Sequence, residues 1–73
     1  MTDGVYKLKE DTTPMQGINL KRGQEFEVVQ NVIYMDGYPL DSNMQGFFYN
    51  WMIAKPKLFE NVTRNWKKGG LNA

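Results

Sequence analysis

The sequence predicts a small α+β domain: a bent antiparallel sheet, or an SH3-like barrel, with one amphipathic helix in the C-terminal half. Short alternating apolar and polar segments, separated by turn residues, run through residues 5–40. After them the spacing of apolar positions changes to that of a helix. The chain has 73 residues and no cysteine, so no disulfide can replace a packed apolar core.

The N-terminal part is expected to supply short strands. Residues 5–9 alternate apolar and polar side chains, and residues 18–20 form a brief extended segment. The segment between them, 10–14, is rich in turn formers, and Pro14 is expected to break any strand ladder there. Residues 21–23 then predict a turn that ends in glycine.

The clearest strand is expected at residues 24–29. Phe26 and Val28 should face one side of the sheet. Glu25 and Glu27 share the other side, which is therefore expected to be a solvated face. A pair of carboxylates on such a face is a weak indication of acid–base chemistry.

Two further turns are expected after this strand. Gln30–Asn31 disturbs the alternation and predicts either a bulge or a tight turn. Residues 32–35 are rich in strand formers, and Asp36–Gly37 is the strongest two-residue hairpin signal in the chain. Residues 38–40 should return as a short edge strand, because they contain a proline.

A helix is predicted over residues 42–55. Ser42 and Gln45 fit a capping box, in which Gln45 would bond back to the start of the helix. The apolar stripe follows at helical spacing: Met44, Phe47, Phe48, Trp51 and Met52. Pro56 should end the helix. A stripe of this kind in so small a chain predicts core packing, and Trp51 is expected to belong to the core.

The segment after the helix is expected to add one more strand. Residues 57–59 predict a short turn that tucks apolar side chains inward, and residues 60–66 predict a last strand. The expected domain therefore spans residues 1–66, and residues 67–73, which contain two adjacent glycines, are expected to form a flexible tail.

Residues 20–29 resemble the diverging-turn segment of SH3-type barrels, in which a leucine, basic residues and a glycine precede an alternating strand. The chain lacks the aromatic ligand-binding motif of true SH3 domains, so no peptide-binding residue is carried over. In length and composition the chain is also similar to small accessory proteins of large tailed phages. That similarity implies an inhibitor or modulator that acts by binding a host protein.

The composition argues against several classes of function. The chain has no histidine and no cysteine, which excludes thiol chemistry and a zinc site built from these residues. No glycine-rich phosphate loop and no convergent nucleophile and base are present, so we expect no enzyme and no cofactor. No membrane span and no secretory signal are recognisable, and we expect a cytoplasmic protein, in the host cytoplasm if phage-encoded.

Protein binding or self-association is the preferred hypothesis. Ten aromatic residues and five methionines exceed what one small core is expected to cover. Tyrosine, tryptophan and methionine are typical of interfaces. The candidate partner-binding residues are Met35, Tyr38, Tyr49, Ile53, Arg64 and Trp66.

Single-stranded nucleic-acid binding is the alternative hypothesis. Arg64, Trp66, Lys67 and Lys68 interleave an aromatic ring with basic side chains, which is typical of base-stacking surfaces. The net charge is only +1, with +3 on residues 37–73. This modest excess favours a protein partner over a polyanion.

Overall fold

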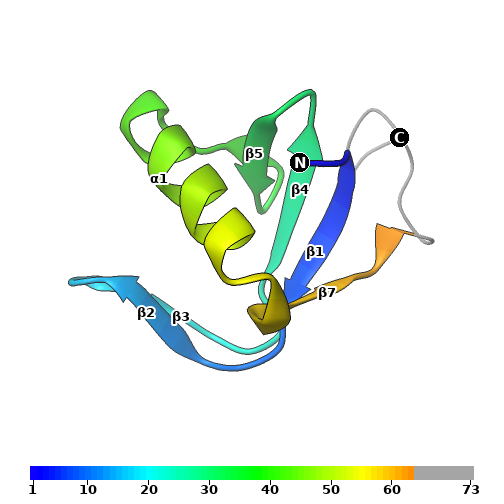
Figure 1. Ribbon diagram of the computed structural model, residues 1–73. Helices are drawn as coiled ribbons and strands as arrows, with labels where there is room; N and C mark the ends of the chain where they lie inside the picture. The colour runs from blue at the N-terminus through cyan, green and yellow to red at the C-terminus, as the bar shows by residue number, and fades with distance from the viewer. Residues whose placement is uncertain (64–73) are drawn as a thin grey trace.

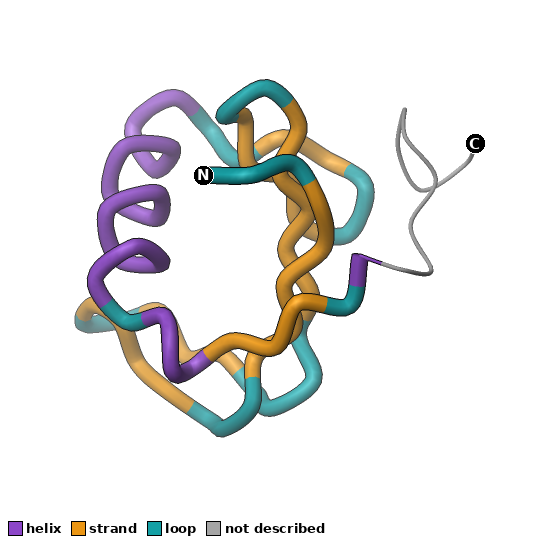
Figure 2. The backbone as a smooth tube through the Cα atoms, turned by 45° about the vertical axis from the view of Figure 1, so that its right-hand side comes forward, coloured by secondary structure: helices purple, strands orange, loops and turns teal. Residues whose placement is uncertain are grey.

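The computed structural model describes residues 1–63 as one helix packed on one face of an antiparallel sheet (Figures 1 and 2). The main sheet has five strands in the order β6-β5-β4-β1-β7, and β2 and β3 form a separate two-stranded ribbon. The strands are β1 (Gly4–Leu8), β2 (Thr12–Met15), β3 (Ile18–Leu20), β4 (Glu25–Val29), β5 (Val32–Met35), β6 (Tyr38–Pro39) and β7 (Phe59–Asn61). The predicted α+β class with a small antiparallel sheet is confirmed. The strands of residues 1–63 do not close into a barrel.

Two-residue turns connect β4 to β5 and β5 to β6. Val29 pairs with Val32 across the first turn, and Met35 pairs with Tyr38 across the second. Gln30–Asn31 and Asp36–Gly37 all have positive φ, as a turn matched to the twist of a hairpin requires. The predicted hairpin at Asp36–Gly37 is confirmed, and Gln30–Asn31 is the tight turn rather than the bulge.

The ribbon of β2 and β3 departs from the sequence prediction. Pro14 lies inside β2, where no pairing was expected. Thr12 pairs with Leu20 and Met15 pairs with Ile18, and the register shifts between these two pairs. A ribbon of two strands tolerates proline because each strand has a free edge. Figure 1 shows the ribbon reaching out below α1.

The core lies between α1 (Ser42–Ala54) and the inner face of the main sheet. Phe26 at its centre is fully buried, and its ring lies 5.8 Å from that of Phe48 and 6.1 Å from that of Phe59. Trp51 packs against this cluster from the margin, half-buried, in edge-to-face contact with three rings. The stripe residues Phe47, Phe48 and Trp51 therefore pack in or against the core, as predicted, whereas Tyr49, expected to be an exposed contact, is half-buried and also packs against the core.

The start of α1 differs from the predicted capping box. Asp41, not Ser42, caps the helix, and its carboxylate accepts a hydrogen bond of 2.8 Å from the Asn43 amide. Gln45 does not reach back to the cap. Its side chain crosses to β5, where it accepts from the Ile33 amide at 2.9 Å and donates to the Ile33 and Leu40 carbonyls at 3.0 and 2.9 Å.

The last strand is shorter than predicted and begins earlier. A 3-10 turn, η1 (Pro56–Leu58), leads directly into β7, which starts at Phe59 and ends at Asn61. Beyond β7 the chain stays beside β1, since the Val62 amide donates to the Val5 carbonyl at 2.9 Å. The predicted domain boundary between residues 66 and 67 lies outside the described residues.

Glu27 corrects the expectation of a solvated carboxylate face. Its side chain lies on the sheet face away from α1 and is only 5% exposed. β4 is the central strand of the sheet, and Val5 and Tyr34 stand opposite Glu27 on the two neighbouring strands. Alternation predicts the face to which a side chain points, but not how deeply its neighbours cover it.

Candidate functional site

The candidate binding residues fall into separate places on the structure. Met35 and Tyr38 stand opposite each other across the β5–β6 turn. Tyr38 is 75% exposed, whereas Met35 is half-buried and packs against the core. This pair presents one exposed tyrosine at the edge of the sheet.

Tyr49 and Ile53 lie one helical turn apart on α1 and therefore share a face. Tyr49 is half-buried, and its hydroxyl accepts a hydrogen bond of 2.7 Å from the Met1 amino group. Ile53 is 53% exposed. Only Ile53 of these two thus offers a large apolar surface to solvent. Arg64, Trp66, Lys67 and Lys68 lie outside the described residues.

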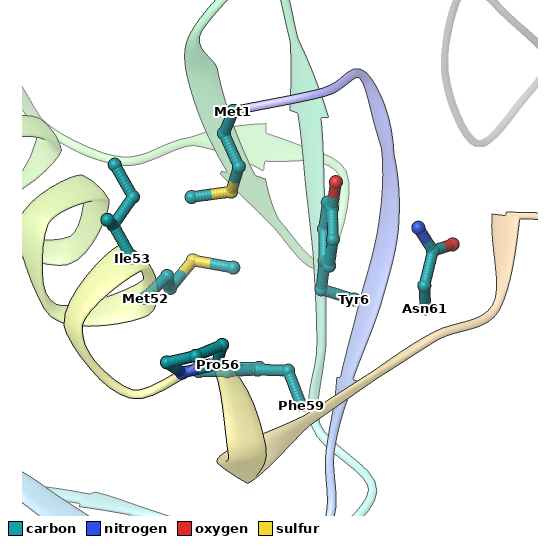
Figure 3. Close-up of a pocket in the computed structure, with 7 residues that line it drawn as sticks. All are labelled: Met1, Tyr6, Met52, Ile53, Pro56, Phe59 and Asn61. Carbon is teal, nitrogen blue, oxygen red and sulfur yellow. The ribbon is translucent and has the colours of Figure 1, made fainter.

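An apolar hollow opens beside Ile53, between the C-terminal part of α1 and strands β1 and β7 (Figure 3). Its volume is about 300 Å³. It is lined by Met1, Tyr6, Met52, Ile53, Pro56, Phe59 and Asn61. Two methionine side chains and a proline ring make up much of the wall, and the flexible methionine side chains adapt to different apolar guests.

Tyr6 is the one ionisable side chain in this lining. Its hydroxyl donates a hydrogen bond of 2.6 Å to the Thr2 carbonyl. Burial, and secondly the negative charge of Asp3, raise the pKa of the Tyr6 hydroxyl above its ordinary value. Tyr6 is therefore neutral at physiological pH, and the side chains that line the hollow are uncharged.

A second hollow adjoins the first at Pro56, which lines both. It has a volume of about 300 Å³ and is lined by Ala54, Lys55, Pro56, Lys57 and Leu58. The ammonium groups of Lys55 and Lys57 form no ion pair within residues 1–63. We call the two hollows together the Pro56 groove. The first hollow is lined by uncharged side chains, and the second also carries the ammonium groups of Lys55 and Lys57.

A carboxylate cluster lies on the opposite face of the sheet. Glu25, Glu27 and Asp36 line a small hollow of about 70 Å³ together with Val5 and Tyr34. Within the part of the chain that the structure describes, no group of three or more acidic residues is placed to hold a metal ion. The small volume leaves little room for a substrate, so this cluster offers a weaker basis for function than the groove.

Basic side chains gather at a further hollow, at the far end of β1. Lys7, Lys9 and Arg22 line it together with Glu60, and its volume is about 570 Å³. Its lining also includes Leu8 and Gly23 but contains no aromatic ring. Stacking of nucleobases needs an aromatic platform, which this hollow lacks. Lys21 nearby in the sequence pairs with Asp11 at 3.8 Å.

Sequence reasoning identified Ile53 but missed the rest of the groove. Met52 was assigned to the core stripe, and Pro56 was interpreted only as the end of the helix. Both residues also border the hollow because η1 turns the chain from α1 into β7 within three residues. The sequence feature that could have indicated the groove was Pro56, which follows the predicted helix close to the exposed Ile53. Tyr6 and Asn61 gave none, since they reach the site through long-range strand pairing, and neither did Met1, whose amino group bonds to the distant Tyr49.

No known protein family, curated protein or solved structure matches this chain. In residues 1–63, the helix that the structure contains is too short to cross a bilayer.

Proposed function

We propose that this chain is a small non-catalytic protein-binding module and that the Pro56 groove is its contact surface. The observation that carries the proposal is Ile53, which is 53% exposed at the rim of an apolar hollow. Every member of the predicted core stripe of α1 is, by contrast, buried or half-buried. Burying an isoleucine side chain of this kind stabilises a complex by about 1.5–3 kcal/mol at most.

The chemistry of the groove supports binding rather than turnover. Its ionisable side chains are Tyr6, Lys55 and Lys57, and no carboxylate lines either hollow. Proton transfer to a bound substrate needs an acid and a base within hydrogen-bond reach of the same atom. Hydrophobic walls with a few flanking charges are instead typical of the central and rim parts of protein interfaces.

Tyr38 supplies a second exposed contact at the sheet edge. Tyrosine is enriched among the residues that dominate binding energy. We propose that Tyr38 and Met35 contribute at the periphery of the interface, with Arg64 and Trp66 as further candidates. The similarity to phage accessory proteins implies a host protein as the partner and the host cytoplasm as the location.

Affinity capture from a cell lysate treated with nuclease tests this function. The wild-type chain should retain a stoichiometric protein partner, and Ile53→Glu should lose it. Val32→Glu is a matched control, because Val32 is also an exposed aliphatic residue, on β5 and outside the groove. Capture that is equally strong for both variants, or absent for the wild type, would exclude the groove as a protein-binding surface.

Single-stranded nucleic-acid binding is the second candidate function. The interleaved aromatic and basic residues Arg64, Trp66, Lys67 and Lys68 of the sequence support it, and the hollow lined by Lys7, Lys9 and Arg22 adds positive charge without an aromatic ring. Binding to phosphates weakens steeply with salt. Titration with single-stranded DNA and RNA at low and moderate salt distinguishes the candidates. Tight binding with a steep salt slope, abolished by Lys67→Ala with Lys68→Ala, would favour the nucleic acid.

A further inference from the structure

We propose that the outer face of the main sheet, the face away from α1, is the docking surface for the chain's own C-terminal segment, residues 64–73. This inference goes beyond the proposed function and is independent of the Pro56 groove. It combines three observations: a buried pair of side chains at the centre of the outer face, the place where the chain leaves β7, and the opposite charges of the face and the segment.

The outer face has a poorly solvated centre. Val5 of β1 and Glu27 of β4 stand opposite each other there and are 6% and 5% exposed. Val5 is not a member of the core cluster beneath α1. The β2–β3 ribbon and η1 contribute Leu20 and Leu58 to that inner core. In residues 1–63, the elements that are added to the main sheet thus pack toward its inner face (Figure 2).

The surroundings of this buried pair are more open to solvent. Four residues around the pair on the same face are exposed: Lys7, Glu25, Val32 and Glu60. Tyr34, opposite Glu27 on β5, is half-buried and covers the pair from one side. Side chains of the sheet cover each other from the sides, whereas cover from above requires a further layer of chain. We infer that residues beyond 63 supply this layer.

The chain leaves β7 at the border of this face. The Val62 amide donates to the Val5 carbonyl at 2.9 Å, and the Val5 amide donates to the Thr63 hydroxyl at 3.2 Å. Gly4 permits this approach, because a Cβ atom there would collide with the Thr63 side chain. Neighbouring strands lie about 4.8 Å apart, and one extended residue spans about 3.3 Å. The first residues after Thr63 therefore reach Glu27 without a long connection.

The outer face and the segment carry opposite charges. Glu25, Glu27 and Asp36 line a hollow of about 70 Å³ on this face. Lys7 stands opposite both Glu25 and Glu60 and offsets part of the negative charge. The segment has no acidic residue and three basic ones: Arg64, Lys67 and Lys68. Carboxylates in poorly solvated surroundings attract cations more strongly than carboxylates in bulk water. The outer face therefore favours a basic segment.

Trp66 supplies the apolar part of this contact. A tryptophan ring buries a large apolar area, and its packing on Val5 accounts for a buried valine outside the inner core. The docked segment holds Arg64 and Trp66 on the side of the sheet opposite the Pro56 groove. A protein or a nucleic acid that binds these two residues therefore competes with the outer face for them.

A spin label on the segment tests the docking in the full chain. The chain has no cysteine, so Gly69→Cys provides a single labelling site. Paramagnetic broadening should be strong at the amides of Glu27 and Tyr34 on the sheet and weak at those of Tyr49 and Ile53 on α1. Broadening that is equal on the two sides, or confined to residues beside Thr63, would overturn the proposal.

Matched variants of the labelled chain separate the two contributions. Glu25→Gln with Asp36→Asn removes two exposed carboxylates of the outer face and should lose most of the broadening on the sheet. Glu10→Gln with Asp11→Asn makes the same change of charge between β1 and β2 and should keep it. Trp66→Ser should also lose it. Amide spectra of the unlabelled variants verify that the sheet is intact. Unchanged broadening in the outer-face double variant would overturn the charge argument, and unchanged broadening in Trp66→Ser would overturn the apolar one.

Discussion

The two ends of α1 are attached to the sheet in different ways. At the N-terminal end, the Gln45 side chain makes three hydrogen bonds to the backbone of Ile33 and Leu40. At the C-terminal end, a hollow of about 300 Å³ opens beside the helix, lined also by residues of β1 and β7, and Ile53 is exposed at its rim. The difference indicates a division of roles: one end fixes the position of the helix, and the other presents a surface for binding.

The aromatic cluster between these two ends is needed for the domain to fold at all. Trp51→Ala should destabilise the fold by about 3–5 kcal/mol, because it removes a large side chain in contact with Phe26, Phe48 and Phe59. A loss of this size unfolds a large fraction of a marginally stable domain. Chemical denaturation monitored by circular dichroism measures it. A cooperative transition at an unchanged midpoint would mean that the half-buried Trp51 belongs to the surface.

Gln45→Ala tests how the N-terminal end of α1 is held on the sheet. The substitution removes the acceptor of the Ile33 amide and the donor to the Leu40 carbonyl, while the Ile33 carbonyl keeps its bond from the Leu40 amide, and it should cost about 2–3 kcal/mol. Gln45→Glu is the control that separates the bonds. Its carboxylate still accepts from the Ile33 amide but places a negative charge beside the Ile33 and Leu40 carbonyl oxygens, so its unfolding midpoint should fall at or below that of Gln45→Ala. Identical midpoints for all three chains would contradict a role for Gln45 in fixing α1.

The identity of the helix cap gives a smaller effect. Asp41→Ala removes the carboxylate that accepts from the Asn43 amide and should cost about 1 kcal/mol. Ser42→Ala, one residue later, should change stability by less than about 0.5 kcal/mol, since Ser42 lies inside the helix and is exposed. Thermal unfolding of the two variants compares them directly. The reverse order would restore the capping box predicted from the sequence.

Local sequence reasoning succeeds for features whose causes are neighbouring residues. The helix, its core stripe and the two tight turns follow from spacing and from residues that adopt positive φ, which are properties of neighbouring residues. The hairpin at Asp36–Gly37 is an example. Each of these features was predicted because its cause lies within a few positions of it.

The errors arise where a distant partner decides the outcome. Gln45 has the right spacing for a capping box. Its side chain instead forms hydrogen bonds with the backbone of Ile33, which is twelve positions away in the sequence but adjacent in the fold. Glu27 lies on the predicted face, yet its neighbours in the sheet bury it. The Pro56 groove joins residues from both ends of the described chain, so its apolar half was not predictable beyond Ile53.

Substitution of Ile53, at the C-terminal end of α1, should have almost no effect on stability. Ile53→Ala is expected to change the free energy of unfolding by less than about 0.5 kcal/mol, because the side chain is 53% exposed and alanine is the better helix former. Met52→Ala, one residue earlier, is the matched control: Met52 is 4% exposed and should cost about 2–5 kcal/mol. Denaturant titration of both variants, beside capture of a partner from nuclease-treated lysate, separates folding from function. Ile53→Ala should keep the wild-type midpoint and lose affinity. A destabilised Ile53→Ala would place this side chain in the core. Both ends of α1 would then serve to hold the helix on the sheet, and neither would be a separate binding surface.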